Sequence, residues 1–148
     1  MAREALLEMD CNRYSKKITD VIKLLDKLGW KYYDFEKNVT YLPLDDSDYF
    51  NWQKRFLSED ELQRLINKKQ DNFEKIGIVL YHENSKEGLT LLANNTDRIV
   101  MSLNINRKTI ENNRESVTDV GWYFENVVQK LEKVGCHIDY VKFEEYTD

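Results

Sequence analysis

Three short apolar segments follow one another between residues 76 and 105, and each has the pattern of a β-strand. Residues 76–82 carry β-branched and aromatic side chains at successive positions, which indicates a strand covered on both faces. Residues 98–105 alternate between apolar and polar with Val100 as the one exception, which is typical of a strand with one solvated face. The polar connections at 83–88 and 94–97 are too short for parallel crossovers. The pattern therefore predicts an antiparallel meander over 76–105.

Three other segments have helical periodicity and are expected near 12–28, 58–71 and 117–134. The apolar positions of the first recur at helical spacing: Tyr14, Ile18, Val21, Ile22, Leu25 and Leu28. In the second, Ser58 and Glu61 have the spacing of a capping box, and Ser116 and Asp119 stand at the same spacing before the third.

Shorter segments complete the predicted fold. Residues 30–35 and 39–44 are aromatic and β-branched around a polar turn, which predicts a hairpin at a sheet edge, and 136–143 predict a last strand. The acidic residues 144–148 are expected to fray. We expect one α+β domain over 1–148, with a mostly antiparallel sheet of about five or six strands packed by about three helices.

Composition limits the class of protein. The chain has 148 residues, 41% hydrophobic and 33% charged, which fits a single globular domain with its own core. Its net charge of −5 disfavours nucleic acid as a partner and suits a basic protein. The start of the chain lacks the apolar core of a signal peptide, and no stretch reaches the ~20 apolar residues of a membrane span. We therefore expect a cytoplasmic protein away from membranes, with Cys11 and Cys136 as free thiols.

The most unusual stretch is 45–52, where three acids stand beside three aromatic residues. It fails as a calcium loop, because the required oxygen ligands and central glycine are missing. One interpretation is structural, with Ser47 or Asp48 capping a short helix and the aromatic residues entering the core. The other is functional: an acidic and aromatic surface captures a basic partner. The residues of that candidate binding site are Asp45, Asp46, Asp48, Tyr49 and Trp52.

Two further hypotheses rest on other residues. His82, beside Glu83 at the end of a predicted strand, is a candidate general base for an enzyme that uses nearby carboxylates. Arg107, Lys108 and Arg114 form a polar connection that would suit phosphate in a nucleic-acid-associated regulator, although Glu111 and Glu115 interrupt it and favour a solvated loop. The sequence has no glycine-rich phosphate loop, no nucleophile elbow and no metal-ligand spacing, so it predicts neither a catalytic residue nor a cofactor.

Size, acidity and the lack of catalytic motifs favour a protein that works by binding. The specific hypothesis is an immunity protein, an inhibitor that neutralises a bacterial toxin by occluding it. Carboxylates of 45–48 would steer the basic partner, and Tyr49 or Trp52 would anchor it.

Overall fold

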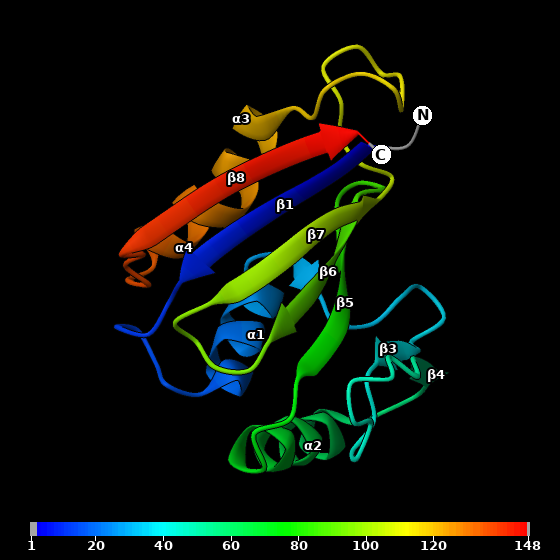
Figure 1. Ribbon diagram of the computed structural model, residues 1–148, viewed down its shortest axis with the longest axis vertical. Coiled ribbons are helices and arrows are strands. Elements are labelled where there is room, and N and C mark those ends of the chain that lie inside the picture. Colours follow the sequence, from blue (N-terminus) through cyan, green and yellow to red (C-terminus); the bar gives the residue numbers. More distant parts are fainter. Residues whose placement is uncertain (1–2, 148) are drawn as a thin grey trace.

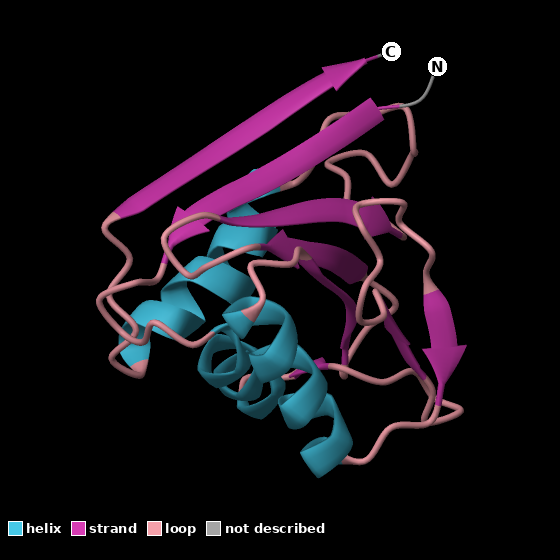
Figure 2. Cartoon of the chain, turned by 60° about the horizontal axis from the view of Figure 1, so that its bottom comes forward, coloured by secondary structure: helices cyan, strands magenta, loops and turns pink. Residues whose placement is uncertain are grey.

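An antiparallel sheet of eight strands forms one layer of the computed structural model, which describes residues 3–147, and the helices lie on one face of it (Figures 1 and 2). The strand order is β4-β3-β5-β6-β7-β1-β8, with β2 also paired to β5. The strands are β1 (Arg3–Asp10), β2 (Trp30–Lys31), β3 (Val39–Tyr41), β4 (Gln53–Arg55), β5 (Ile76–His82), β6 (Gly88–Ala93), β7 (Ile99–Ile105) and β8 (Tyr140–Thr147). The α+β class is confirmed, and the expected count of five or six strands was too low.

The predicted meander is confirmed as β5, β6 and β7, which are paired antiparallel in sequence order. The prediction that the first of these strands is covered on both faces also holds. Ile78 and Leu80 are buried toward the helices, and Gly77 and Val79 are buried on the opposite face.

Two strands were missed for different reasons. In β1 the residues Ala5, Leu7 and Met9 are buried while their neighbours are less so, which is the alternation of a strand with one covered face. Because acidic residues stand among these apolar positions, the sequence of β1 resembles an exposed terminal segment unless its partner strands are known. The short strand β4 has no apolar residue at all, so its sequence carries no strand signal.

The helices are α1 (Ile18–Lys27), α2 (Glu59–Asp71) and a third segment composed of α3 (Val120–Tyr123), the π-helical η1 (Phe124–Gln129) and α4 (Lys130–Lys133). All three predicted helices are present. The capping box at the start of α2 is confirmed, since Ser58 Oγ accepts from the N–H of Glu61 and Glu61 accepts from the N–H of Ser58. At the third helix the cap is Asp119, not Ser116: Asp119 Oδ1 accepts from the N–H of Trp122.

The hairpin predicted over 30–44 is wrong. β2 pairs with β5, and β3 pairs with β4 and β5, so β2 and β3 are not partners. The turn between them is organised by Asp34, whose Oδ1 accepts from the N–H groups of Glu36 and Asn38. These hydrogen bonds stabilise the turn from within, so it does not depend on β2 and β3 pairing with each other.

The last strand runs further along the chain than predicted. It is β8, at Tyr140–Thr147, and it pairs along its full length with β1. The expectation that 144–148 fray is therefore wrong for 144–147, and residue 148 lies outside the described part of the chain. Glu145 explains the difference, because its carboxylate is held by Arg3 and Thr118.

The two cysteines lie together in the core. Both thiols are free and fully buried, and a hydrogen bond between them raises the pKa of Cys11 and lowers that of Cys136. The contact joins the end of β1 to the segment before β8. Within residues 3–147, no helix has the length and apolar character needed to cross a membrane.

Candidate functional site

The segment 42–52 crosses the sheet face that points away from the helices, and it is anchored there on β5. A Cβ atom placed on Gly77 would lie 2.8 Å from Cη2 of Trp52 and 2.6 Å from Cδ1 of Leu42, so both side chains press directly on the glycine. The N–H of Leu42 also donates to the carbonyl of Gly77, at 3.0 Å. Leu42 is buried but does not belong to the main core cluster, which places this packing on the second face of the sheet.

Asp46 organises the segment from within. Its carboxylate oxygens accept from the N–H groups of Phe50 and Asn51, each at 2.8 Å, and its side chain is buried. The expectation that Asp46 faces a partner is therefore not what the structure shows. This carboxylate is already used to close a tight loop.

The backbone of the loop is unusual for a stretch without glycine. Asp45, Ser47, Asp48 and Phe50 all have positive φ, at 60°, 52°, 61° and 55°. A left-handed conformation costs a non-glycine residue of the order of 1 kcal/mol or more, and such residues cluster where the surrounding structure holds them for a purpose. The loop does not form the short helix considered in the structural interpretation.

A buried lysine holds the base of the loop. Lys69 of α2 is 1% exposed, and its ammonium group donates to the carbonyl of Pro43 and lies 3.4 Å from Glu74. Glu74 in turn accepts from the N–H of Asp45, at 2.8 Å. A buried charge is tolerated only when it is paired and hydrogen-bonded. Here the partners are Glu74 and the carbonyl of Pro43, which lies at the start of the loop. The sequence predicts a helix over 58–71 that contains this lysine, and it gives no sign of the burial of the side chain.

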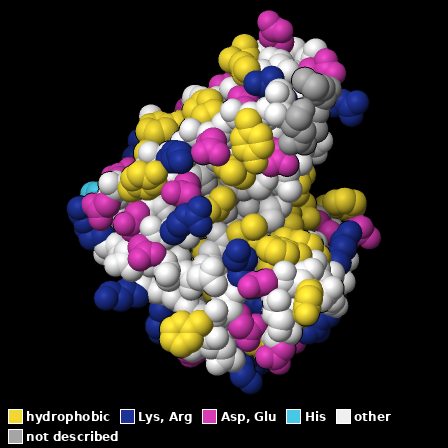
Figure 3. All heavy atoms as spheres, in the orientation of Figure 1, with side chains coloured by type: hydrophobic (Ala, Val, Ile, Leu, Met, Phe, Trp, Pro, Cys, Tyr) yellow, Lys and Arg dark blue, Asp and Glu magenta, His cyan; other side chains and the backbone are white. Residues whose placement is uncertain are grey.

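Four aromatic side chains are left exposed by this arrangement, among polar and charged ones. Tyr49 is 77% exposed and Phe56 is 64% exposed, while Phe50 and Trp52 are 43% and 37% exposed. Asp45 and Asp48 are also exposed. We call residues 45–56, which include the edge strand β4, the aromatic loop surface. Figure 3 shows hydrophobic side chains gathered on this face of the molecule beside a hollow.

Charge on the aromatic loop surface is mixed. Lys54 lies 3.5 Å from the carboxylate of Asp34, and Lys75 Nζ lies 5.6 Å from the centre of the Phe50 ring. Arg55 donates to the hydroxyl of Tyr41, at 2.8 Å. These cations offset the exposed carboxylates nearby, and the four exposed aromatic side chains form the apolar part of the surface.

His82 is mostly buried among aromatic side chains and lines a cavity at the end of β5. It is 9% exposed and lies between the rings of Trp30 and Trp122, with centroid distances of 4.9 and 5.3 Å. Its Nδ1 pairs with Ser85 Oγ at 2.7 Å, and its Nε2 is buried without a hydrogen-bond partner among residues 3–147. Burial lowers its pKa, with a further contribution from the charge of Lys130. Among residues 3–147, no carboxylate hydrogen-bonds to either ring nitrogen, although the charges of Glu87 and Glu83 oppose the lowering of the pKa of His82.

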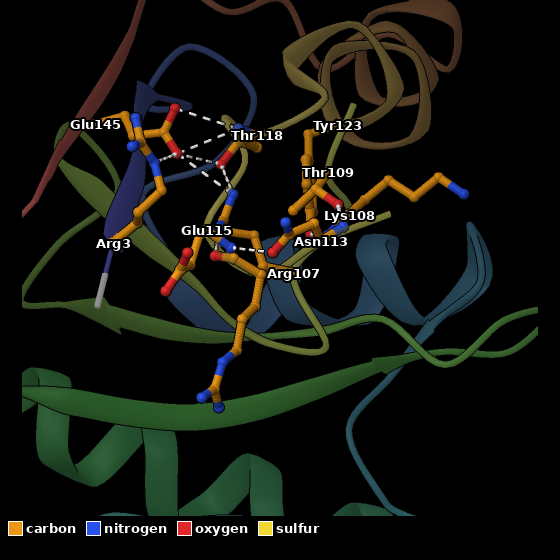
Figure 4. Close-up of polar contacts among 10 residues, drawn as sticks. Arg3, Arg107, Lys108, Thr109, Asn113, Glu115, Thr118, Tyr123 and Glu145 are labelled. Carbon is orange, nitrogen blue, oxygen red and sulfur yellow. Dashed lines mark hydrogen bonds and ion pairs between the residues drawn. The ribbon is translucent and has the colours of Figure 1, made fainter. Parts of the chain in front are cut away.

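Arg107, one of the three candidate phosphate-binding cations, is built into a polar network (Figure 4). Its Nη1 donates to Thr118 Oγ1 at 2.8 Å and lies 3.3 Å from Glu145 Oε2. Burial raises the pKa of Glu145, but hydrogen bonds from Thr118 and Arg3 outweigh it and hold the pKa below its ordinary value. The charge of Arg107 is therefore compensated. Residues 110–115 are exposed, as expected of a solvated loop, while Arg107 and Thr118 at its two ends are bound to Glu145 of β8.

Of the other two residues of that group, Arg114 lines the same cavity as Arg107, and Lys108 does not. The N–H of Lys108 donates to the hydroxyl of Tyr123, and the carbonyl of Arg114 accepts from Arg107. These two hydrogen bonds and an isolated β-bridge between Thr109 and Thr118 stabilise the loop over 106–119.

Comparison with models of known protein families finds no match, and comparison with curated proteins and with solved structures finds none either. Among residues 3–147, no cluster of three or more His, Cys, Asp or Glu side chains is placed to hold a metal ion.

Proposed function

We propose that this protein binds another protein through the aromatic loop surface and inhibits that partner by occluding it. The observation that carries the proposal is the exposure of Tyr49, Phe50, Trp52 and Phe56 on a loop with a fixed backbone. Tyr, Trp and Phe are enriched in protein interfaces, where a few buried aromatic anchors supply most of the binding energy.

The internal support of the loop favours binding. The carboxylate of Asp46, the ammonium group of Lys69 and the contact of Trp52 with Gly77 hold the backbone in place before any partner arrives. A preformed surface loses less conformational entropy on association than a flexible one. The strained, non-glycine conformation of the loop is thereby maintained in the free protein.

Electrostatics plays a secondary part in this proposal. The net charge of −5 and the exposed Asp45 and Asp48 favour a basic partner, while Lys54 and Arg55 limit the local effect. Acidic inhibitors that cover a basic target gain mainly in the rate of association. An immunity protein that neutralises a toxin is the kind of inhibitor these features suit best.

The test is affinity capture of the tagged chain from its own cells, followed by mass spectrometry. We expect a stoichiometric partner that is captured by the wild type and lost with Tyr49→Ala/Phe56→Ala. Ile110→Ala is the matched control, because Ile110 is 65% exposed and lies outside the aromatic loop surface. The activity of the captured partner, measured with and without this protein, tests inhibition directly.

Two results would count against the proposal. Recovery of the chain alone at matched expression would remove the evidence for a protein partner. Capture of the same partner by the Tyr49→Ala/Phe56→Ala variant would show that another surface binds it.

A further inference from the structure

The strand β8 forms one end of the sheet, outside β1 (Figure 1). It pairs with β1 from Tyr140 to Thr147, and among residues 3–147 no strand pairs with its other side. Phe143 and Glu145 are half-buried, and the remaining residues of the strand are exposed. A long, open edge of this kind is a template on which a further strand can pair.

The backbone groups at the open edge can be assigned. In an antiparallel sheet, residues that bond to one neighbouring strand alternate with residues that bond to the other. The N–H of Leu42 donates to the carbonyl of Gly77, so the odd-numbered residues of β5 face β3. Following the paired residues from β5 through β6, β7 and β1 shows which residues of β8 bond to β1. There the even-numbered residues face β1, and Val141, Phe143 and Glu145 present their N–H and C=O groups to the open edge.

The side chains of β8 on the sheet face away from the helices have a self-complementary order. Phe143 is opposite Leu7 and belongs to the core face, so Tyr140, Lys142, Glu144 and Tyr146 lie on the other face. The order is aromatic, cation, anion, aromatic. Lys142 Nζ lies 3.2 Å from Glu144 Oε2 within the strand, and this contact raises the pKa of Lys142.

One register of antiparallel self-pairing uses this order. When two copies of β8 are related by a two-fold axis at Phe143, Lys142 of each copy is opposite Glu144 of the other, and Tyr140 is opposite Tyr146. The outward N–H and C=O groups of Val141 then meet those of Glu145, and Phe143 meets its own copy. Registers centred on Lys142 or Glu144 place like charges opposite each other, which is unfavourable across a sheet.

We propose that β8 pairs with β8 of a second copy of this chain in that register, which joins the two sheets into one. Charges on an edge strand usually prevent association. Here their order selects one closed, two-fold arrangement. An apolar cavity of about 430 Å³, lined by residues that include Phe124, Val128 and Val141, lies beside the same edge and adds contact area on the helix side.

This pairing is independent of the proposed inhibition. The aromatic loop surface includes β4, at the other end of the sheet from β8. Loss of either interaction by mutation should therefore leave the other unchanged.

The test is sedimentation velocity over a concentration series, comparing wild type with Lys142→Glu, Glu144→Lys and the double exchange Lys142→Glu/Glu144→Lys. Both side chains are about half exposed. Because Lys142 is opposite Glu8 of β1 in the same chain, circular dichroism and thermal unfolding check that each variant keeps its fold. We expect a wild-type dimer, each single variant about tenfold weaker in dimerisation, and recovery in the double exchange. An equimolar mixture of the two single variants should form a heterodimer.

A wild-type monomer at every concentration up to about 1 mM, a weak affinity on the usual scale, would overturn the self-pairing and leave the edge open to a strand of another protein. A dimer whose dissociation constant is the same in both single variants would overturn it equally, because the interface would then lie elsewhere.

Discussion

The indole ring of Trp52 lies directly over Gly77, on the face of β5 that points away from the helices. The contact links the aromatic loop surface to the central strand of the sheet. It also explains why a glycine stands in the middle of a buried strand, where it is otherwise unfavourable.

Gly77→Ala should therefore destabilise the protein by about 1–3 kcal/mol, because its methyl group must displace Trp52 and Leu42 from a tightly packed contact. Urea unfolding measures the change. In a Trp52→Ala background the cost should fall by about 1 kcal/mol, since one of the two opposing side chains is gone. An equal cost in both backgrounds would show that Trp52 does not press on the glycine in solution.

Asp46→Ala should destabilise the protein by about 2 kcal/mol, since two backbone N–H groups lose a charged acceptor. The loop should also become more susceptible to chymotrypsin, which cleaves at aromatic residues. Asp48→Ala is the control: its side chain is exposed, so we expect a change within about 0.5 kcal/mol. Similar losses in the two variants would contradict the role given to Asp46.

Lys69→Met should cost about 3 kcal/mol of unfolding free energy, because Glu74 and the carbonyl of Pro43 lose a buried cation. Lys68→Met is the matched control on the same helix, at an exposed position, and should have little effect. Thermal unfolding of both variants, read by circular dichroism, decides the question. A neutral Lys69→Met would mean that apolar packing replaces the ion pair without loss.

The stability of the protein should depend on pH through His82. The pKa of this residue is lowered in the folded state, below a value of about 6.5 in the unfolded chain. Its contribution is therefore complete above pH ~6.5 and is lost as the pH falls toward the folded-state pKa, since the unfolded state then binds the proton more readily.

The measurement is the free energy of unfolding from pH 7 to pH 5 for the wild type and for His82→Phe. Carboxylates also titrate over part of this range and are common to both proteins. We expect a steeper decline for the wild type. Parallel curves would show that the pKa of His82 is not lowered by its surroundings.

The central meander and the capped helix were predictable because their signals are local. Alternation at 98–105 and the Ser58–Glu61 capping box are complete within a few residues, so no distant partner is needed to interpret them. The strands β1 and β4 were not predictable in this way. The partners of β1 are β7 and β8, which lie far away in the chain, and β4 itself has no apolar residue.

The binding role of 45–52 stays a prediction, and the structure shows which of its side chains are exposed. The stretch 45–52 was identified from its unusual composition, and Tyr49, Asp45 and Asp48 are exposed as a binding role requires. Asp46 was assigned to the surface because a sequence does not show which carboxylate accepts backbone N–H groups. Phe56 was not among the predicted site residues, and its exposure is not evident from the sequence.

The position of β1 has a consequence for how the chain folds. Leu7 pairs with Met101 on one side and with Phe143 on the other, so both partners of this early strand lie more than halfway along the chain. Closing such long loops costs chain entropy before any contact repays it, and domains rich in distant contacts fold slowly. Until β7 forms, the apolar side chains of Ala5, Leu7 and Met9 have no sheet to join. The N-terminal strand is thus the segment most exposed to aggregation or chaperone binding during synthesis.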